Sequence, residues 1–215
     1  MKPGTPAKKA KPSLTAVRIL RFRVTLRDIT PAIWRVLELC ANATFWDLHC
    51  AIQNSFGWTH SHLHQFSMLR AAKTRKIVIG IPDDEWVGVP GMPKVLAGWT
   101  EPVRDWLTEP GHAALYEYDF GDSWEHDVVL EAIALADPGA KLPRCVAGEN
   151  KGPPDDVGGP HGYSLFLEAM SDPRHEEHAS YREWIGGKWN PREFEAGKVK
   201  FVSAKRWLAD LLAGG

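Results

Sequence analysis

The stretch RILRFRVTLRDITPAIWRVLEL (residues 18–39) decides the fold class because apolar and polar residues alternate through its first half. Such alternation has the period of a β-strand, here with one apolar and one basic face. Residues 28–31 indicate a turn, since proline fixes φ and cannot donate to a strand ladder. Residues 33–39 then predict a second strand, antiparallel to the first.

Working outward, residues 44–56 predict a helix. Thr44 lies three residues before Asp47, which is the spacing of a capping box. Gly57 stands where a helix commonly ends on a left-handed residue. Between these ends the apolar residues recur at helical spacing: Phe45, Leu48, Ile52 and Phe56. A third strand over residues 62–69 would complete a β-β-α-β unit.

The remaining chain predicts one hairpin and several helices. Residues 71–112 contain many prolines and are predicted as loops with one helical turn at residues 103–107. Strands over residues 115–120 and 124–133 flank a Gly121–Asp122 turn. Helices are predicted over residues 165–170 and 174–185, from Asn190, and from Ser203.

These elements predict an α+β fold with a curved mixed or antiparallel sheet of about five strands and helices gathered toward the C-terminus. Residues 16–215 would form a single domain. Residues 1–15 combine lysines with proline and alanine, which predicts a disordered basic tail.

Composition narrows the functional classes. The 215 residues carry a formal net charge of -1, so no global charge attracts nucleic acid or membrane. Three cysteines without a CxxC pair argue against a disulfide framework and against a cysteine-rich zinc site. No apolar run approaches the roughly 18 residues of a membrane span. We therefore expect a cytoplasmic protein without a membrane partner.

Several longer strings occur together: ITPAIWRVLEL, TFWDLHCAIQNSFGWTHSHLHQF, YEYDFGDSWEHDVVLE, PPDDVGGPHGY and WNPREF. In these strings and their order the chain resembles the plasmid pRiA4b ORF-3-like family over roughly residues 18–200. The resemblance implies a bacterial protein of mobile-element type, and some members of that family carry a resolvase-type label. Recombination chemistry needs a nucleophile among clustered basic groups, whereas the basic residues here are dispersed.

The string YDFGDSWEH supplies the first candidate metal ligands, Asp119, Asp122 and His126. Carboxylates with an imidazole suit Mg²⁺, Mn²⁺ or Zn²⁺. The alternative is that the aspartates cap their own turn and that the histidine is a hydrogen-bonded strand residue.

The Gly/Pro-rich segment after residue 148 supplies a second candidate set, Glu149, Asp155 and Asp156. A stiff loop that displays carboxylates suits a cation because a preorganised site orders less on binding. The alternative is that these carboxylates cap the following helix. We expect this segment and the hairpin turn near residue 121 to fold against each other, so that residues 119–163 form one acidic surface.

Histidines and arginines supply two further candidate sets. His60, His62 and His64 recur with period two, and His62 and His64 could present nitrogens to one metal ion from a strand. The alternative is strand histidines without a metal. Arg21, Arg23, Arg27 and Arg35 are the candidate nucleic-acid-binding residues, and the alternative for them is a solvated sheet face.

No catalytic residue is assigned, because the phosphate-loop, dinucleotide-binding and nucleophile-elbow motifs are absent from the sequence. The expected function is a non-catalytic binding module for a protein or nucleic-acid partner of unknown identity. It would act through the acidic surface, with a divalent cation as the candidate cofactor. One alternative is a metal-dependent phosphodiester hydrolase that uses the same residues. Another is a DNA-binding protein associated with transposition or recombination.

Overall fold

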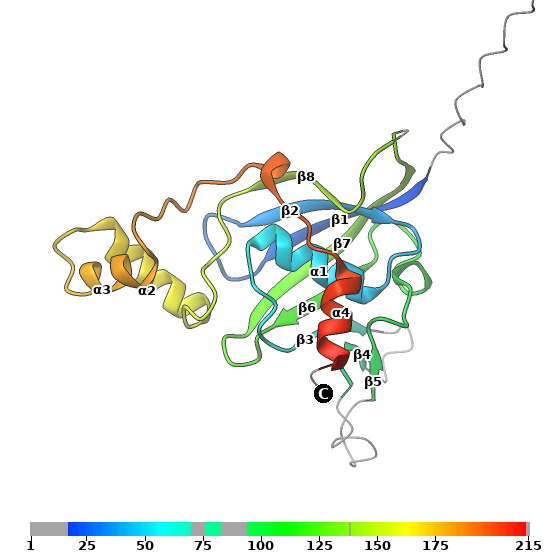
Figure 1. Cartoon of the computed structure of the whole chain (residues 1–215), viewed down its shortest axis with the longest axis horizontal. Coiled ribbons are helices and arrows are strands. Elements are labelled where there is room, and N and C mark those ends of the chain that lie inside the picture. The colour runs from blue at the N-terminus through cyan, green and yellow to red at the C-terminus, as the bar shows by residue number, and fades with distance from the viewer. Residues whose placement is uncertain (1–16, 70–75, 83–93, 138, 214–215) are drawn as a thin grey trace, which may run out of the picture.

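Eight strands build the body of the protein in the computed structural model, which describes residues 17–69, 76–82, 94–137 and 139–213. The strands are β1 (Arg18–Leu26), β2 (Trp34–Cys40), β3 (His64–Leu69), β4 (Lys76–Gly80), β5 (Val95–Ala97), β6 (Ala113–Tyr118), β7 (Trp124–Leu135) and β8 (Arg144–Glu149). They form one curved sheet in the order β5-β4-β3-β6-β7-β1-β2-β8 (Figure 1). Only the β4–β5 pair is parallel among the described strands.

The α+β class is therefore confirmed, while the expectation of about five strands was too low. The predicted loops over residues 71–112 include β4 and β5, and the predicted tail over residues 1–15 lies outside the described residues. β5 has three residues and β8 contains a glycine, so neither carries a clear alternating pattern. Their strand conformation comes from pairing with β4 and β2, which the local sequence cannot show.

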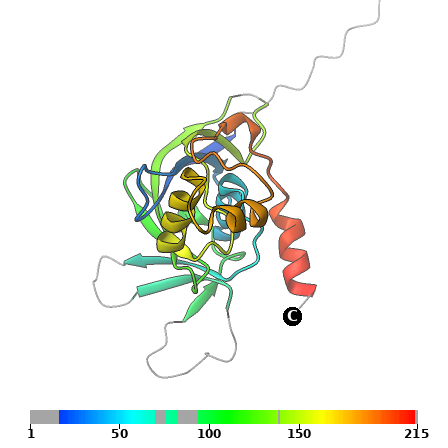
Figure 2. The same cartoon turned by 90° about the vertical axis from the view of Figure 1, so that its left-hand side faces the viewer.

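Helix α1 (Phe45–Phe56) forms as predicted and lies inside the curve of the sheet (Figure 2). The Thr44 side chain accepts from the Asp47 N–H, and the Asp47 carboxylate accepts from the Thr44 N–H, so both halves of the capping box are present. Gly57 ends the helix at φ 85°, a conformation that glycine adopts without strain. Nearly the whole surface of α1 is buried, which fixes the position of its C-terminal end.

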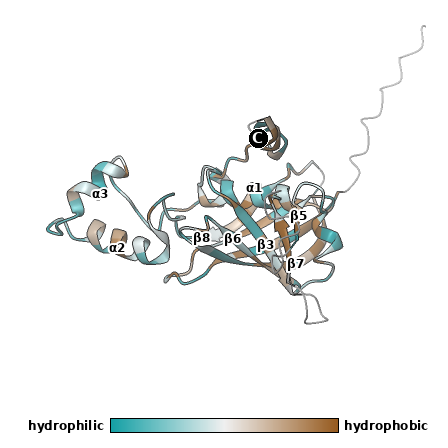
Figure 3. Ribbon diagram, turned by 90° about the horizontal axis from the view of Figure 1, so that it is seen from below, coloured by the Kyte–Doolittle hydropathy of each residue, from teal (hydrophilic) through white to brown (hydrophobic). Residues whose placement is uncertain are grey.

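The later helices are α2 (Gly159–Ser171), α3 (His178–Trp184) and α4 (Ala204–Ala213), with 3-10 turns at Val103–Asp105 and Ala196–Lys198. Helices α2 and α3 form a lobe beside the sheet, while α4 lies alone near α1 (Figures 1 and 3). No helix within the described ranges is long and apolar enough to cross a membrane.

The helix expected from Asn190 is not formed. The Asn190 side chain instead accepts from the N–H of Arg192 in a local turn. Helix α3 begins at His178 instead of residue 174, because Asp172 accepts from the Arg174 N–H and holds that segment in a turn.

Imidazoles are buried on the inner face of the sheet. His64 and His126 lie on β3 and β7, and both are fully enclosed. The His64 ring stacks on His49 of α1 with centroids 3.5 Å apart. Burial lowers the pKa of His64 and of His126 to about 3, so these rings are neutral at pH 7.

This burial makes stability depend on pH. Between pH 6.5 and about 3 the unfolded chain binds a proton at His126 that the native protein excludes, so the free energy of unfolding falls as pH falls through that window. Between pH 8 and pH 5 the free energy of unfolding should therefore fall by on the order of 2 kcal/mol less in His126→Leu than in the wild type. Urea unfolding at pH 8, 6.5 and 5 measures this.

Leu130→Val is the control, because it changes another buried residue of β7 without removing a titrating group, and it should lower stability equally at each pH. An unchanged pH dependence in His126→Leu would contradict the assignment.

Candidate metal-binding site

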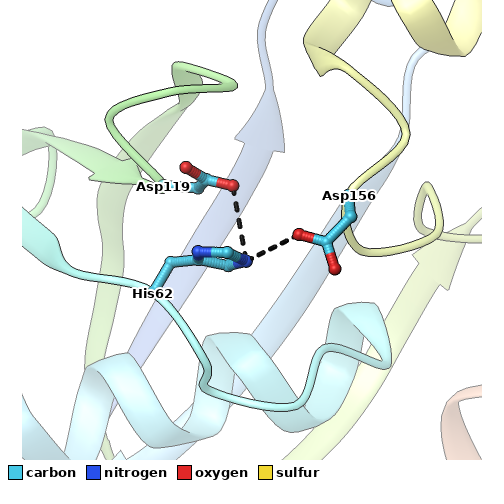
Figure 4. A group of neighbouring side chains, drawn as sticks. All are labelled: His62, Asp119 and Asp156. Carbon is cyan, nitrogen blue, oxygen red and sulfur yellow. Dashed lines mark hydrogen bonds and ion pairs between the residues drawn. The ribbon is translucent and has the colours of Figure 1, made fainter.

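Three side chains that are distant in sequence converge at one end of the sheet: His62, Asp119 and Asp156 (Figure 4). His62 Nε2 lies 2.8 Å from Asp156 Oδ1 and 3.6 Å from Asp119 Oδ2. One ligand atom from each residue lies within 4.8 Å of the other two. Two ligands of one ion at about 2.1 Å are separated by about 3–4 Å, so these atoms can share a cation after a small adjustment.

Asp119 is positioned by the β6–β7 turn. One carboxylate oxygen, Oδ1, accepts from the N–H groups of Gly121 and Asp122 at 3.0 and 3.3 Å. This Asx-type turn leaves Oδ2 directed at His62. Asp119 itself has φ 55°, a left-handed conformation that is unfavourable for most residues other than glycine.

Asp156 is positioned by residues 151–158, the loop between β8 and α2, and it also has positive φ, 60°. The preceding Asp155 accepts from the N–H and the hydroxyl of Thr59 at 2.9 and 2.8 Å. Asp122 accepts from the N–H of Gly158 at 3.1 Å. These bonds fasten the loop to the His62 segment on one side and to the hairpin turn on the other.

The same loop is seated on the C-terminal end of α1. The Trp58 indole donates to the Pro153 carbonyl at 2.9 Å. Gly152 lies so close to Phe56 that a Cβ at this position would collide with the Phe56 carbonyl oxygen. The expectation that the hairpin turn and the segment after residue 148 fold against each other is therefore confirmed by direct contacts.

Two buried polar atoms beside the triad lack a hydrogen-bond partner among the described atoms. They are the Tyr118 hydroxyl and Asp155 Oδ1. Burial raises the pKa of Tyr118 to about 12, so the hydroxyl keeps its proton. A buried polar atom without a partner in the protein is costly unless water or an ion satisfies it.

The donor set is one imidazole nitrogen and two carboxylate oxygens. Such mixed ligands suit Mn²⁺ or Zn²⁺ better than Ca²⁺ or Mg²⁺, which prefer oxygen alone. Three protein ligands leave coordination positions open, as in metal sites that engage a further ligand.

Several expected ligands lie apart from the triad. The carboxylates of Asp122 and Asp155 bond to Gly158 and Thr59 and act as fasteners of the loop. Glu149 lies on the edge strand β8, where its carboxylate accepts from the Trp34 indole at 3.3 Å. Only one residue from each of the two acidic segments therefore joins His62.

The two other expected imidazoles are in the core. His126 pairs in register with Tyr116, so its ring enters the interior instead of facing Asp119. His64 stacks on His49. His60 has φ 63°, which breaks the extended segment that period two assumed. The His60 ring packs against His49 and Trp207, whereas the His62 ring contacts Asp119 and Asp156, so the three imidazoles have different partners.

The arginines expected to contact nucleic acid are engaged within the protein. Arg21 donates to Glu38 at 2.9 and 2.5 Å. The Arg27 side chain pairs with Asp127 and Glu125 on β7. The Arg23 guanidinium lies 4.0 Å from the centre of the Trp34 ring.

Arg35 does not lie on the exposed arginine face. It is 1% exposed and donates to the backbone carbonyls of Trp34, Ser55 and Glu149. Its guanidinium also lies 3.6 Å from the centre of the Phe194 ring. Arg35 thus joins β2, α1 and β8 and cannot reach a phosphate. A single sequence offers no signal that separates it from its exposed neighbours.

Sequence reasoning missed two residues that shape the site, Thr59 and Tyr118. Thr59 holds the loop through Asp155, and Tyr118 supplies the unpartnered hydroxyl. Tyr118 directly precedes Asp119 at the end of an alternating strand. The alternation predicts that its side chain is buried, but it does not predict where the hydroxyl lies.

The seating of the loop on α1 can be tested at Gly152. We expect Gly152→Ala to lower the free energy of unfolding by about 1–3 kcal/mol, because the new methyl group displaces the loop from Phe56. Gly197→Ala is the matched control, since a Cβ there meets no atom within 4 Å. Urea denaturation compares the two, and equal stabilities would contradict the close contact.

Comparison with known proteins agrees with the resemblance seen in the sequence. The family described as "Plasmid pRiA4b ORF-3-like protein" matches residues 18–198. The uncharacterized protein y4hQ of Sinorhizobium fredii (strain NGR234) is 33% identical over 195 residues, or 91% of this chain and 93% of that protein. The crystal structure of a protein of unknown function from Methanosarcina mazei Go1 has a TM-score of 0.76 at 33% identity, covering 87% of this chain and 100% of that chain. This chain therefore belongs to the plasmid pRiA4b ORF-3-like family.

Proposed function

We propose that this protein is a cation-dependent binding module whose ion is held by His62, Asp119 and Asp156. The observation that carries the proposal is the convergence of three ligand atoms from three separate loops. In this proposal the ion completes its coordination with an oxygen group from a protein or nucleic-acid partner. The expected origin in a mobile element remains a prediction.

The backbone at the site supports a functional role. Asp119 and Asp156 both have positive φ, and each such residue costs of order 1 kcal/mol or more. Strain of this kind persists where surrounding contacts impose it, and it is common at binding sites. Here it directs one carboxylate oxygen from each loop toward His62.

The surroundings of the triad support binding from outside. Leu63 and Phe120 directly follow His62 and Asp119 and are 54% and 47% exposed. A hollow of about 360 Å³ opens beside His62, with Trp207 and Leu211 of α4 in its wall. Exposed apolar side chains beside an open coordination site are suited to a partner that combines an anionic group with an apolar one.

A second candidate function is metal-dependent phosphodiester hydrolysis. The observation that favours it is the same open coordination, because an ion with three protein ligands can also lower the pKa of a bound water. We rank it second because each remaining acidic group near the triad, Asp122 and Asp155, already holds a backbone N–H or a threonine hydroxyl.

Metal titration tests the cation site. We expect one Mn²⁺ per chain by calorimetry, and at a free concentration 100 times the Kd we expect about 2.7 kcal/mol of stabilisation. This corresponds to a rise in Tm of roughly 5–10 °C for a chain of this size. The double variant Asp119→Asn, Asp156→Asn should abolish both effects, since it removes two charges while an amide oxygen at residue 119 can still accept in the turn.

Glu131→Gln is the matched control, because Glu131 is an exposed carboxylate on β7 outside the site. Absence of stoichiometric Mn²⁺ binding, or equal binding by the double variant, would sink the proposal. Assay of the Mn²⁺-loaded protein on a chromogenic phosphodiester separates the two functions. Turnover that disappears in the double variant would favour the hydrolase over the binding module.

A further inference from the structure

A second cavity lies away from the triad and shares no residue with it. This cleft has a volume of about 940 Å³ and is bounded by α1, by the end of β2 with the start of β8, and by the segment over residues 196–205. Ligand clefts in proteins commonly measure about 300–1,000 Å³. The volume therefore suits a small organic molecule.

The walls of the cleft are largely apolar, with a few convergent polar groups. The apolar part comes from all three walls and includes Leu39, Ala51, Pro143, Val199 and Phe201. Asn54 of α1 spans two walls, since its side-chain oxygen accepts from the N–H of Val202 at 3.1 Å. This bond ties the 196–205 segment to α1. The combination is typical of a preformed ligand site.

The charged groups of the cleft favour an anion. Lys141, Arg144 and Lys205 line it. Arg144 is held by the buried Glu38 at 2.6 Å, whereas the two lysines form no ion pair with any residue that the structure describes. The single carboxylate in the lining, Asp47, already accepts from the N–H and hydroxyl of Thr44 in the capping box.

The first turn of α4 adds partial positive charge to the cleft. Ser203, Ala204 and Lys205 all line the cleft, so the N-terminal end of the helix opens onto it. Free N–H groups at a helix N-terminus carry partial positive charge and attract anions. Lys141 and Lys205, which come from different walls, and the N-terminal end of α4 thus line one largely apolar space.

All three cysteines of the chain also line the cleft. Cys50 and Cys145 are buried, and burial raises the pKa of both thiols, which keeps them protonated and unreactive. Cys40 is half-buried at the end of β2 and is the most accessible of the three. Its reactivity therefore reports on whether the cleft is filled.

We propose that this cleft binds a small organic anion, with an apolar body against Ala51 and Phe201 and a carboxylate, sulfonate or phosphate group between Lys141 and Lys205. The site is independent of the cation site, and neither requires the other. No covalent step is involved, and the three thiols act as apolar lining.

Fluorescence titration of the full chain with 8-anilinonaphthalene-1-sulfonate tests the proposal. We expect saturable binding of one probe per chain, with at least a tenfold weaker affinity in the double variant Lys141→Glu, Lys205→Glu. Decanoate should compete with the probe, and decyltrimethylammonium, which has the same tail and the opposite charge, should not. Saturating decanoate should also slow the reaction of Cys40 with a chromogenic disulfide.

Lys188→Glu is the matched control, because this exposed lysine lies outside the cleft. It should bind the probe as the wild type does. Near-ultraviolet circular dichroism of the tryptophans confirms that each variant is folded. Unsaturable binding, equal affinity in the folded double variant, or equal competition by the cationic detergent would overturn the proposal. Retained Mn²⁺ binding in that variant would show that failure here leaves the cation site intact.

Discussion

The seating of residues 151–158 on the C-terminal end of α1 is the contact on which the rest of the site depends. Gly152 approaches the Phe56 carbonyl more closely than any side chain would permit, and the Trp58 indole anchors Pro153. Because α1 is itself enclosed by the sheet, the loop inherits a fixed position from the core.

Fixing the loop has a consequence for the backbone. Asp119 and Asp156 occupy left-handed conformations, which aspartate adopts more readily than most residues but still at a cost. The fasteners Asp122 and Asp155 hold the turns from both sides and offset this strain. Four carboxylates in a small region thus divide into two roles. Two bind the protein's own N–H and hydroxyl groups, and two keep an oxygen free for a ligand.

Charge is used differently on the two halves of the molecule. On β1, Arg21 and Arg27 form ion pairs with carboxylates and Arg23 lies over the Trp34 ring, so part of the positive charge of this face is compensated within the protein. Lys141 and Lys205, which line the cleft, form no ion pair with another residue in the described part of the chain. The two candidate sites share no residue. Lys141 and Lys205 line the larger cleft, and His62 of the cation site lines the smaller hollow.

Local physics fixed the β1–β2 pair, the capping box of α1 and the β6–β7 hairpin, and these are readable in the sequence because period, cap and turn residues act over a few positions. The sequence also placed Asp119 and Asp156 on the segments that meet. Only the tertiary structure decided that His62 and not His64 lies beside the two aspartates. It also decided that Arg35 is buried and that Asp155 accepts hydrogen bonds from Thr59. Those outcomes depend on φ at His60, on strand register and on contacts between segments about a hundred residues apart, and no local pattern encodes them.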